Sequence, residues 1–344
     1  MNPYALSIII SSLALGTITT LSGHHWIMAW IGLEINTLAV IPLMTKTPHP
    51  RAIEAATKYF LTQAAASALI LFASTVNAWL TGEWAINTSM HEAPAIMLSI
   101  ALAMKLGVAP FHFWLPEVLQ GLTLQTGLIL STWQKLAPMA LLIQLSQTTN
   151  LHLMLSLGVL STLIGGWGGI NQTQIRKILA FSSIAHLGWM VVVLKISPQL
   201  TLLNFILYIL MTSALFLTLM YLNTKNINEL SISWSKTPAL STLSLLTLLS
   251  LSGLPPLTGF MPKWLIAQEL VKQNLIMLTL AILMLTLLSL FFYLRLTYTM
   301  TLTLAPNSSN SASTWGLSKK NNMALPIMLS LLMLPTTPTL MMIL

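Results

Sequence analysis

Long runs of hydrophobic residues, separated by short polar stretches, follow one another along the whole chain. They occupy residues 3–21, 26–44, 59–80, 93–121, 124–146, 151–170, 178–194, 200–222, 237–272, 275–299 and 323–344. Most have the roughly 20 residues that an α-helix needs to cross about 30 Å of hydrocarbon. The runs are continuous rather than alternating, which favours helices over a β-barrel. The pattern predicts an all-α polytopic membrane protein with about eleven transmembrane helices.

Composition supports a membrane class and excludes several kinds of chemistry. Of the 344 residues, 55% are hydrophobic and only 6% are charged, whereas soluble domains have about 25% charged residues. The chain has no cysteine, which excludes disulfides, thiolate metal sites and Cys-ligated iron–sulfur clusters. No glycine-rich nucleotide motif is present. The first run has no basic stretch before it, so we expect it to be the first span and not a cleavable signal.

The basic residues predict an orientation in the membrane. With eleven spans, one side of the membrane collects nine basic loop residues: Lys46, Arg51, Lys58, Arg176, Lys177, Lys225, Lys236, Lys319 and Lys320. The other side collects two, Lys195 and Lys272. Basic loops mark the inner side of a membrane protein, so we interpret the net charge of +8 as a topology signal and not as a nucleic-acid surface. The N-terminus is predicted on the positive side and the C-terminus on the opposite side.

Two segments repeat one spacing of glycine, proline and charge. They are GVAPFHFWLPE at residues 107–117 and GLPPLTGFMPK at residues 253–263. Each interrupts a long hydrophobic run, and the two interrupted runs are five spans apart. An odd number of helices per repeat inverts the second copy, and inverted repeats with discontinuous helices are typical of transporters. The alternative is coincidence, because glycine and proline are frequent in membrane helices. The predicted helix-breaking residues are Gly107, Pro110, Pro116, Gly253, Pro256 and Pro262.

This repeat predicts the organisation of the chain. We expect a first five-helix bundle over residues 1–149 and a second, inverted five-helix bundle over residues 150–304. Two of these helices are expected to be broken. The polar, Ser/Asn-rich stretch at residues 305–322 is the only linker-like segment, and residues 305–344 are expected to form this loop and one C-terminal helix.

Ionisable residues lie within the predicted spans, away from their ends. Each central charge costs on the order of 2.5–3.5 kcal/mol on insertion scales, so such residues are candidates for function. An anchoring role near the aqueous boundary is the alternative for Lys263, and a histidine that is satisfied within the core is the alternative for His186 and His112. The candidates are Glu34, Lys105, Lys135, Lys263, His186 and His112.

These residue types point to proton transfer. Burial disfavours the charged form of an amine or a carboxyl, whereas a nearby opposite charge favours it. A Glu–Lys pair that forms and breaks therefore acts as a switch for a further lysine, and Glu34, Lys105 and Lys135 fit these three parts. A broken helix frees backbone carbonyls, which bind ions or water where protein lines a cavity. Together, these features predict a hydrated proton route.

Several blocks of the sequence resemble the antiporter-like membrane-arm subunits of mitochondrial NADH–ubiquinone oxidoreductase, respiratory complex I. The blocks are WIGLEINTLAVIPL, MKLGVAPFHFWLPEV, STWQKLAP, SSIAHLGW and SGLPPLTGFMPKW, and their order covers the whole chain. The resemblance implies that Glu34 and Lys105 form the charge pair of that family, and that Lys135 is its central lysine. It likewise implies that Lys263 is the distal lysine and His186 the bridging histidine.

The resemblance also implies the setting of the chain. It would be a subunit of a proton-translocating enzyme in the mitochondrial inner membrane, with its N-terminus on the matrix side and its C-terminus on the intermembrane side. It would have no catalytic or redox site and would bind no cofactor itself, because NAD, FMN, iron–sulfur clusters and ubiquinone belong to partner subunits. The implied partners are other membrane-arm and accessory subunits in a large hetero-oligomer, and lipids such as cardiolipin, but not nucleic acid.

Three other functions remain open at this point. A stand-alone cation/proton antiporter would share the buried lysines and broken helices. A structural scaffold would use the same charges only to join helices. A solute carrier would require a cavity with specific polar groups.

Overall fold

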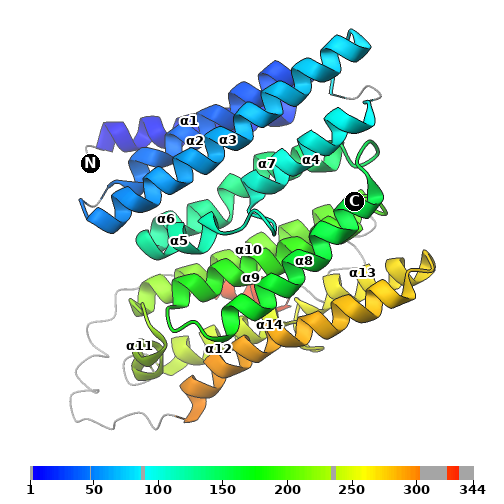
Figure 1. Ribbon diagram of the computed structural model, residues 1–344. Coiled ribbons are helices and arrows are strands. Elements are labelled where there is room, and N and C mark those ends of the chain that lie inside the picture. Colours follow the sequence, from blue (N-terminus) through cyan, green and yellow to red (C-terminus); the bar gives the residue numbers. More distant parts are fainter. Residues whose placement is uncertain (1–2, 47, 87–89, 234–237, 303–323, 333–344) are drawn as a thin grey trace. The chain divides into compact units, whose positions relative to one another are not determined.

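The computed structural model describes residues 3–46, 48–86, 90–233, 238–302 and 324–332, and this part of the chain is helical, with turns and two isolated β-bridges but no strand (Figure 1). The predicted linker at residues 305–322 and the end of the run 323–344 lie outside the described residues, as do Lys236, Lys319 and Lys320. The helices are α1 (Pro3–Ser22), α2 (Trp26–Met44), α3 (Pro50–Thr81), α4 (Glu92–Leu106), α5 (Trp114–Gly121), α6 (Leu124–Ser131), α7 (Trp133–Gln144), α8 (Leu151–Ile170), α9 (Ile175–Val193), α10 (Pro198–Leu222), α11 (Ile227–Ile232), α12 (Pro238–Ser252), α13 (Phe260–Lys272), α14 (Ile276–Leu302) and α16 (Ala324–Leu332).

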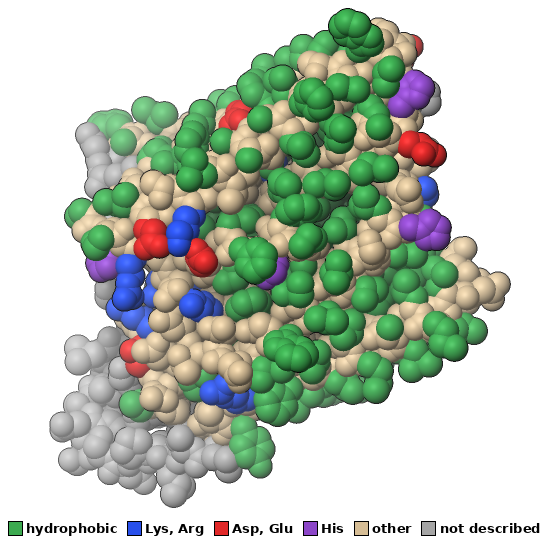
Figure 2. All heavy atoms as spheres, viewed as in Figure 1, with side chains coloured by type: hydrophobic (Ala, Val, Ile, Leu, Met, Phe, Trp, Pro, Cys, Tyr) green, Lys and Arg blue, Asp and Glu red, His purple; other side chains and the backbone are tan. Residues whose placement is uncertain are grey.

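Seven of the described helices are long and apolar enough to cross a membrane: α1, α2, α3, α8, α9, α10 and α14. Their hydrophobic side chains cover the lengths of the helices, and most of the charged side chains on the visible face gather near helix ends (Figure 2). In α1 and α14 only 22% and 28% of the most apolar stretch is buried within the chain. A water-soluble fold seldom exposes so much contiguous apolar surface, so the chain is a multi-pass membrane protein.

The chain divides into two compact units, each described by itself. The first contains Met1–Thr162 and His186–Thr201, and the second contains Leu163–Ala185 and Leu202–Leu344. In the first unit α1 packs along α2, α2 along α3, and α3 against both α4 and α5. In the second unit α14 packs against α11, α12 and α13, and α12 packs against α16.

Both units contain the same backbone bridge between two loops. Each bridge joins the loop before the second helix of its unit to the loop after the third, through two reciprocal N–H···O bonds. In the first unit the donors and acceptors are Trp26 N to Trp84 O (3.1 Å) and Ile86 N to His24 O (3.0 Å). In the second unit they are Ile175 N to Lys225 O (3.1 Å) and Ile227 N to Thr173 O (3.2 Å).

Close helix crossings also correspond between the two units. A Cβ added at Gly16 of α1 would lie 2.5 Å from Asn36 Oδ1 of α2, and a Cβ added at Gly165 of α8 would lie 2.6 Å from the backbone nitrogen of Ala185 in α9. Each glycine precedes its neighbour by 20 residues. Small residues let membrane helices approach closely in the absence of a hydrophobic driving force. The two pairs of helices therefore depend on glycine at the same relative position.

Two predicted spans differ from the helices that form. The run 59–80 lies within the longer helix α3, because Pro50 is favourable in the first turn and the Nδ1 atom of His49 accepts a hydrogen bond from the Arg51 amide (3.1 Å). This extension places Glu54 and Lys58 on a helix.

The run 124–146, predicted as one helix, is divided at Thr132 into α6 and α7. The helices of the described chain therefore interrupt three hydrophobic runs and not two.

The α1–α2 crossing yields a stability prediction. In Gly16→Ala the new methyl would meet Asn36 and the carbonyl oxygen of Gly32 (2.9 Å), so the helices must move apart. Overpacking of this kind costs about 1–3 kcal/mol. We expect a lower midpoint of thermal unfolding for the solubilised protein, whereas Leu15→Ala, on the exposed side of the same helix, should leave the midpoint nearly unchanged. Equal midpoints for the two variants would contradict the close crossing.

Candidate functional site

The first helix interruption begins at Gly107. Its φ of 77° is in the left-handed region, where glycine avoids the strain that a Cβ would cause. The amides of Gly107 and Val108 both donate to the carbonyl of Ala103 (3.0 Å each), which closes the last turn of α4. The chain is then non-helical until α5 begins at Trp114, whose Nε1 donates to the carbonyl of Met104 (3.1 Å). Pro110 lies in this non-helical segment, whereas Pro116 lies in the first turn of α5, where proline is tolerated.

His112 lies inside this interruption and is buried, with 4% of its surface exposed. Its ring packs against Phe113 at a centroid distance of 4.3 Å, and it forms a hydrogen bond with the backbone of Pro110. Its Nδ1 atom has no hydrogen-bond partner within the described part of the chain. The histidine is therefore only partly satisfied by its surroundings.

The second interruption separates α12 from α13. Gly253 has a φ of 85°, and Pro256 lies in the turns that follow, while Pro262 lies in the first turn of α13. The Nζ atom of Lys263 donates to the carbonyl of Ser252, the last residue of α12 (2.7 Å). A cation at this position satisfies a carbonyl that the helix cannot pair and complements the helix dipole.

Two more cations are satisfied by backbone carbonyls, one in the loop before α8 and one at the end of α8. Lys195 donates to the carbonyl of Thr149 (2.6 Å), and Arg295 of α14 donates to that of Ile170, the last residue of α8 (2.6 Å). These contacts anchor basic residues without a carboxylate.

The third interruption lies directly before Lys135. At Thr132 the backbone angles (φ −113°, ψ −67°) depart from ideal helix values, although its amide (3.0 Å) and its hydroxyl (2.7 Å) both donate to the carbonyl of Leu128. Pro138 has no amide hydrogen, so it cannot donate to the carbonyl of Gln134, four residues earlier. Lys135 therefore lies between a distorted turn, where its amide donates to the carbonyl of Thr132 (3.3 Å), and the carbonyl of Gln134, which has no amide partner at Pro138. Its side chain is buried, with 2% exposed.

A small cavity of about 10 Å³ lies in the first unit and is lined in part by Lys135. This volume matches about one water-sized sphere. Residues from α2, α3, α4, α5, α6 and α7 line it: Leu33, Asn36, Thr37, Tyr59, Gln63, Lys105, Leu106, Trp114, Leu130, Gln134, Lys135, Ala137 and Pro138. The structure therefore brings together Lys105 and Lys135 around one cavity, whereas Lys263, His186 and His112 are not among its lining residues.

Glu34 adjoins the cavity through Thr37, whose hydroxyl donates to Glu34 Oε2 (2.8 Å). The carboxylate lies within electrostatic range of the Lys105 amine. However, the ion pairs found among the described residues do not include a contact between these two side chains within 4 Å. The Nζ atom of Lys105 is buried and has no hydrogen-bond partner in the described part of the chain. The two groups are thus neighbours that are not in direct contact.

His186 lies in α9 and is buried, with 6% exposed. His186 is the first residue of the part of α9 that belongs to the first compact unit. Its burial is compatible with either interpretation of the sequence, a proton-transfer residue or a satisfied core histidine.

Sequence reasoning missed the neutral polar residues of the cavity. Tyr59 Oη lies 3.3 Å from Gln134 Oε1, and Gln134 Nε2 donates to the carbonyl of Asn36 (3.1 Å). Gln63 Nε2 donates to the carbonyl of Lys105 (3.4 Å). A search for amide side chains within hydrophobic runs would have found Asn36, Gln63 and Gln134 but not Tyr59, since unpaired amides are costly in a membrane.

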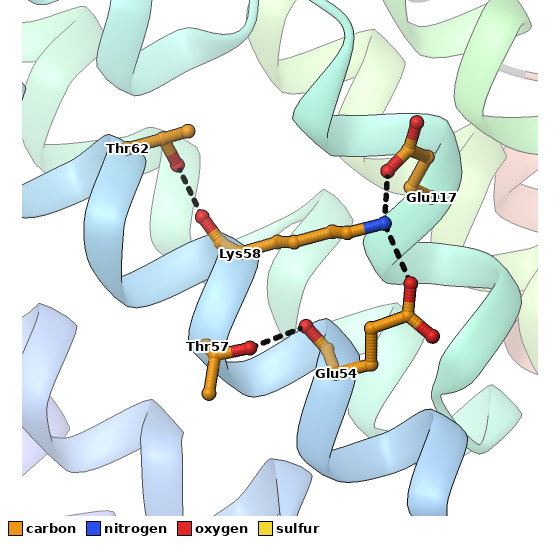
Figure 3. A network of polar contacts seen from close by, with 5 residues as sticks. All are labelled: Glu54, Thr57, Lys58, Thr62 and Glu117. Atoms are coloured by element: carbon orange, nitrogen blue, oxygen red, sulfur yellow. Dashed lines mark hydrogen bonds and ion pairs between the residues drawn. The ribbon is translucent and has the colours of Figure 1, made fainter.

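A charged network lies on the surface near the first interruption (Figure 3). The Nζ atom of Lys58 lies 2.6 Å from Glu117 Oε2 and 2.7 Å from Glu54 Oε1. Glu54 and Lys58 are on α3, and Glu117 is in the first turn of α5, so one of the two contacts joins the half-helix to α3. At the other end of α5, Gly121 approaches the backbone of Arg51 and the side chain of Ala55 closely.

The network predicts a salt-sensitive contribution to stability. In Lys58→Met the link between α3 and Glu117 is lost, and Glu54 and Glu117 no longer have a cation between them. We expect a modest fall in the thermal midpoint, smaller at high ionic strength because exposed charges are screened. Lys272→Met is the matched control, since Lys272 pairs with Glu269 of its own helix (2.6 Å). A fall for Lys58→Met that is no larger than in this control would contradict the linking role.

Within the described ranges, no three His, Asp or Glu side chains gather into a group that could hold a metal ion. The chemistry supported by the described residues is proton binding and release by amines, a carboxylate and imidazoles around kinked helices. Interrupted membrane helices with buried charges define an antiporter-like class of membrane protein.

Comparison with known families agrees with this class. A model of the NADH:quinone oxidoreductase/Mrp antiporter transmembrane region matches residues 23–289, and a model of the NADH dehydrogenase subunit 2 C-terminus matches residues 290–341. Relatives named NADH-ubiquinone oxidoreductase chain 2 are 63% identical in Aquarana catesbeiana, over 100% of both chains, and 60% identical in Salmo salar, over 98% of both. The chain belongs to the NADH-ubiquinone oxidoreductase chain 2 family, which confirms the resemblance seen in the sequence.

Solved structures share the fold. Respiratory complex I from Thermus thermophilus with bound aureothin contains a chain with a TM-score of 0.83 and 26% identity, over 97% of this chain and 80% of that one. An Mrp complex from a Dietzia species gives a TM-score of 0.81 at 18% identity, over 88% of this chain and 62% of that one. At this low identity the Mrp match shows the fold alone.

Proposed function

We propose that this chain is a membrane-arm subunit of proton-translocating NADH:ubiquinone oxidoreductase, and that its first unit moves protons through the cavity between Lys105 and Lys135. The observation that carries the proposal is the placement of two buried amines, from α4 and α7, around one cavity that a third charge, Glu34, adjoins. Membership of the chain 2 family supplies the enzyme to which such a subunit belongs.

Each charged residue has its own role in the proposed proton transfer. Glu34 biases Lys105 towards its charged form, and Lys105 and Lys135 exchange protons with water in the cavity. Because Glu34 and Lys105 do not touch, a small movement of α2 against α4 suffices to change their interaction. Lys263 is the distal lysine, held at the end of α12 by the carbonyl of Ser252. His186 and His112 are further proton carriers.

The topology we propose has eleven spans, with five-helix bundles at residues 1–149 and 150–304. The matching loop bridges and glycine crossings support an internal repeat. The spacing shared by residues 107–117 and 253–263 supports inversion of that repeat, because the two interrupted runs are five spans apart. The excess of basic loop residues supports an N-terminus on the matrix side of the mitochondrial inner membrane and a C-terminus on the intermembrane side.

Membership of the family supports a proposal about the cofactors and partners of this chain. The chain holds no redox cofactor, and NAD, FMN, iron–sulfur clusters and ubiquinone are bound by partner subunits. Its exposed apolar faces on α1 and α14 meet other membrane-arm and accessory subunits or lipids such as cardiolipin. The fold shared with an Mrp complex keeps a stand-alone cation/proton antiporter as the second candidate.

Substitution of the central lysine tests the proposal. In Lys135→Met the side chain keeps its approximate length but cannot carry a proton. Positioned proton-transfer groups contribute roughly 10²- to 10⁴-fold, so we expect proton translocation by the assembled enzyme to fall by about tenfold or more. The measurement is proton uptake into inner-membrane vesicles driven by NADH and ubiquinone.

The exposed lysine variant Lys272→Met is the control and should pump normally. Normal pumping by Lys135→Met in fully assembled enzyme would overturn the proposal. Sodium-dependent proton exchange by the isolated chain, with no requirement for NADH, would instead favour the antiporter.

A further inference from the structure

Helix α3 contacts both α4 and α7 at the cavity through two neutral side chains. Tyr59 and Gln63 are four residues apart and therefore lie on one face of α3. Tyr59 contacts Gln134, the residue before Lys135, and Gln63 donates to the backbone carbonyl of Lys105 itself. All of these residues line the same cavity.

The contact with Gln134 matters because the helix is irregular on both sides of this residue. Thr132 has distorted helical angles, the Lys135 amide donates to the Thr132 carbonyl three residues earlier (3.3 Å), and Pro138 cannot donate to the Gln134 carbonyl. The Gln134 side chain replaces this missing restraint. Its amide nitrogen donates to the Asn36 carbonyl of α2 (3.1 Å), while its oxygen accepts from the Tyr59 hydroxyl of α3 (3.3 Å).

Tyr59 is itself fixed in place. Its side chain is 1% exposed, and its ring meets the Trp114 ring edge-on at a centroid distance of 5.8 Å. Trp114 in turn donates to the Met104 carbonyl beside Lys105 (3.1 Å). A chain of contacts therefore runs from the end of α4 through Trp114, Tyr59 and Gln134 to the turn that carries Lys135.

We infer that Tyr59, Gln63 and Gln134 are positioning residues that hold Lys105 and Lys135 facing each other across the cavity. This inference rests on the proposed proton-transfer function. The three side chains touch the backbone or the neighbours of the lysines and carry no charge themselves. The titratable groups that they arrange are Lys105 and Lys135, with Glu34 as the nearby carboxylate.

A double-mutant cycle in the assembled enzyme tests the inference. Tyr59→Phe removes the hydroxyl but keeps the ring against Trp114, and Gln134→Met removes both polar atoms at similar length. Because a displacement of about 1 Å can cost on the order of 100-fold, we expect each variant to lower proton translocation per assembled enzyme by about threefold or more. The double variant should be little worse than Gln134→Met alone, since Gln134→Met already removes the bond to the Tyr59 hydroxyl together with the bond to the Asn36 carbonyl.

Tyr208→Phe is the matched control. Tyr208 is fully buried, its hydroxyl bonds to Ser183 of the second unit, and neither residue lines the cavity. Its translocation rate per enzyme and the pH profile of that rate should match those of the unsubstituted enzyme. Tyr59→Phe and Gln134→Met should both shift the pH profile, because they change the spacing of Lys105, Lys135 and Glu34.

The outcomes separate this inference from the proposed function. Lower amounts of enzyme, with the rate per enzyme and the pH profile at control values, would mean a structural role only and would overturn the inference. If Tyr59→Phe does not assemble, Gln134→Met still tests the inference. The Gln134 side chain is only partly buried, so its substitution should disturb assembly less. If Lys135→Met pumps normally, the proposed function fails; if it does not pump while both positioning variants match Tyr208→Phe, only the inference fails.

Discussion

The structure depends on one constraint, which is that a charged amine inside an apolar environment must meet a polar group. Few carboxylates are available, since the chain has seven acids in 344 residues. Backbone carbonyls take their place: carbonyls at helix ends accept from Lys263 and Arg295, and a carbonyl in the loop before α8 accepts from Lys195. An intact helix uses its carbonyls internally, so the interruption at Gly253 creates the group that Lys263 needs. The positions of the helix interruptions and of the buried cations are therefore linked, because an interruption supplies the carbonyl that a cation needs.

Lys105 is the exception, and the function proposed for the first unit depends on it. Its amine is buried next to a cavity and has no direct hydrogen-bond partner within the described residues, while Glu34 acts on it from a distance. A group in this position is sensitive to small displacements, because neither a short bond nor bulk water fixes its protonation. Direct contact with Glu34 would hold the amine in its charged form. The separation of the two groups is thus better suited to a switch than a permanent ion pair would be.

Helix α3 links the surface of the first unit to its interior through consecutive residues. Lys58 joins α3 to the half-helix α5 by an exposed contact with Glu117, and Tyr59 joins it to the same half-helix by packing on Trp114. The exposed contact is weakened by solvent and salt, whereas the buried ring contact is not. The position of α5, and with it one wall of the cavity, is therefore set mainly by the aromatic pair.

Much of this could be predicted from the sequence, because the cost of placing polar groups in hydrocarbon is a local property. The hydrophobic runs predicted the helices, Gly107 and Gly253 predicted two interruptions, and the charges within runs identified Glu34, Lys105 and Lys135. Only the tertiary structure showed that Lys105 and Lys135 share a cavity and that Lys105 and Glu34 remain apart. It also revealed the break at Thr132 and the contacts of Tyr59 and Gln134. A neutral amide or hydroxyl gains its role from the partner that it meets, and that partner is decided by helix packing, which no stretch of sequence encodes alone.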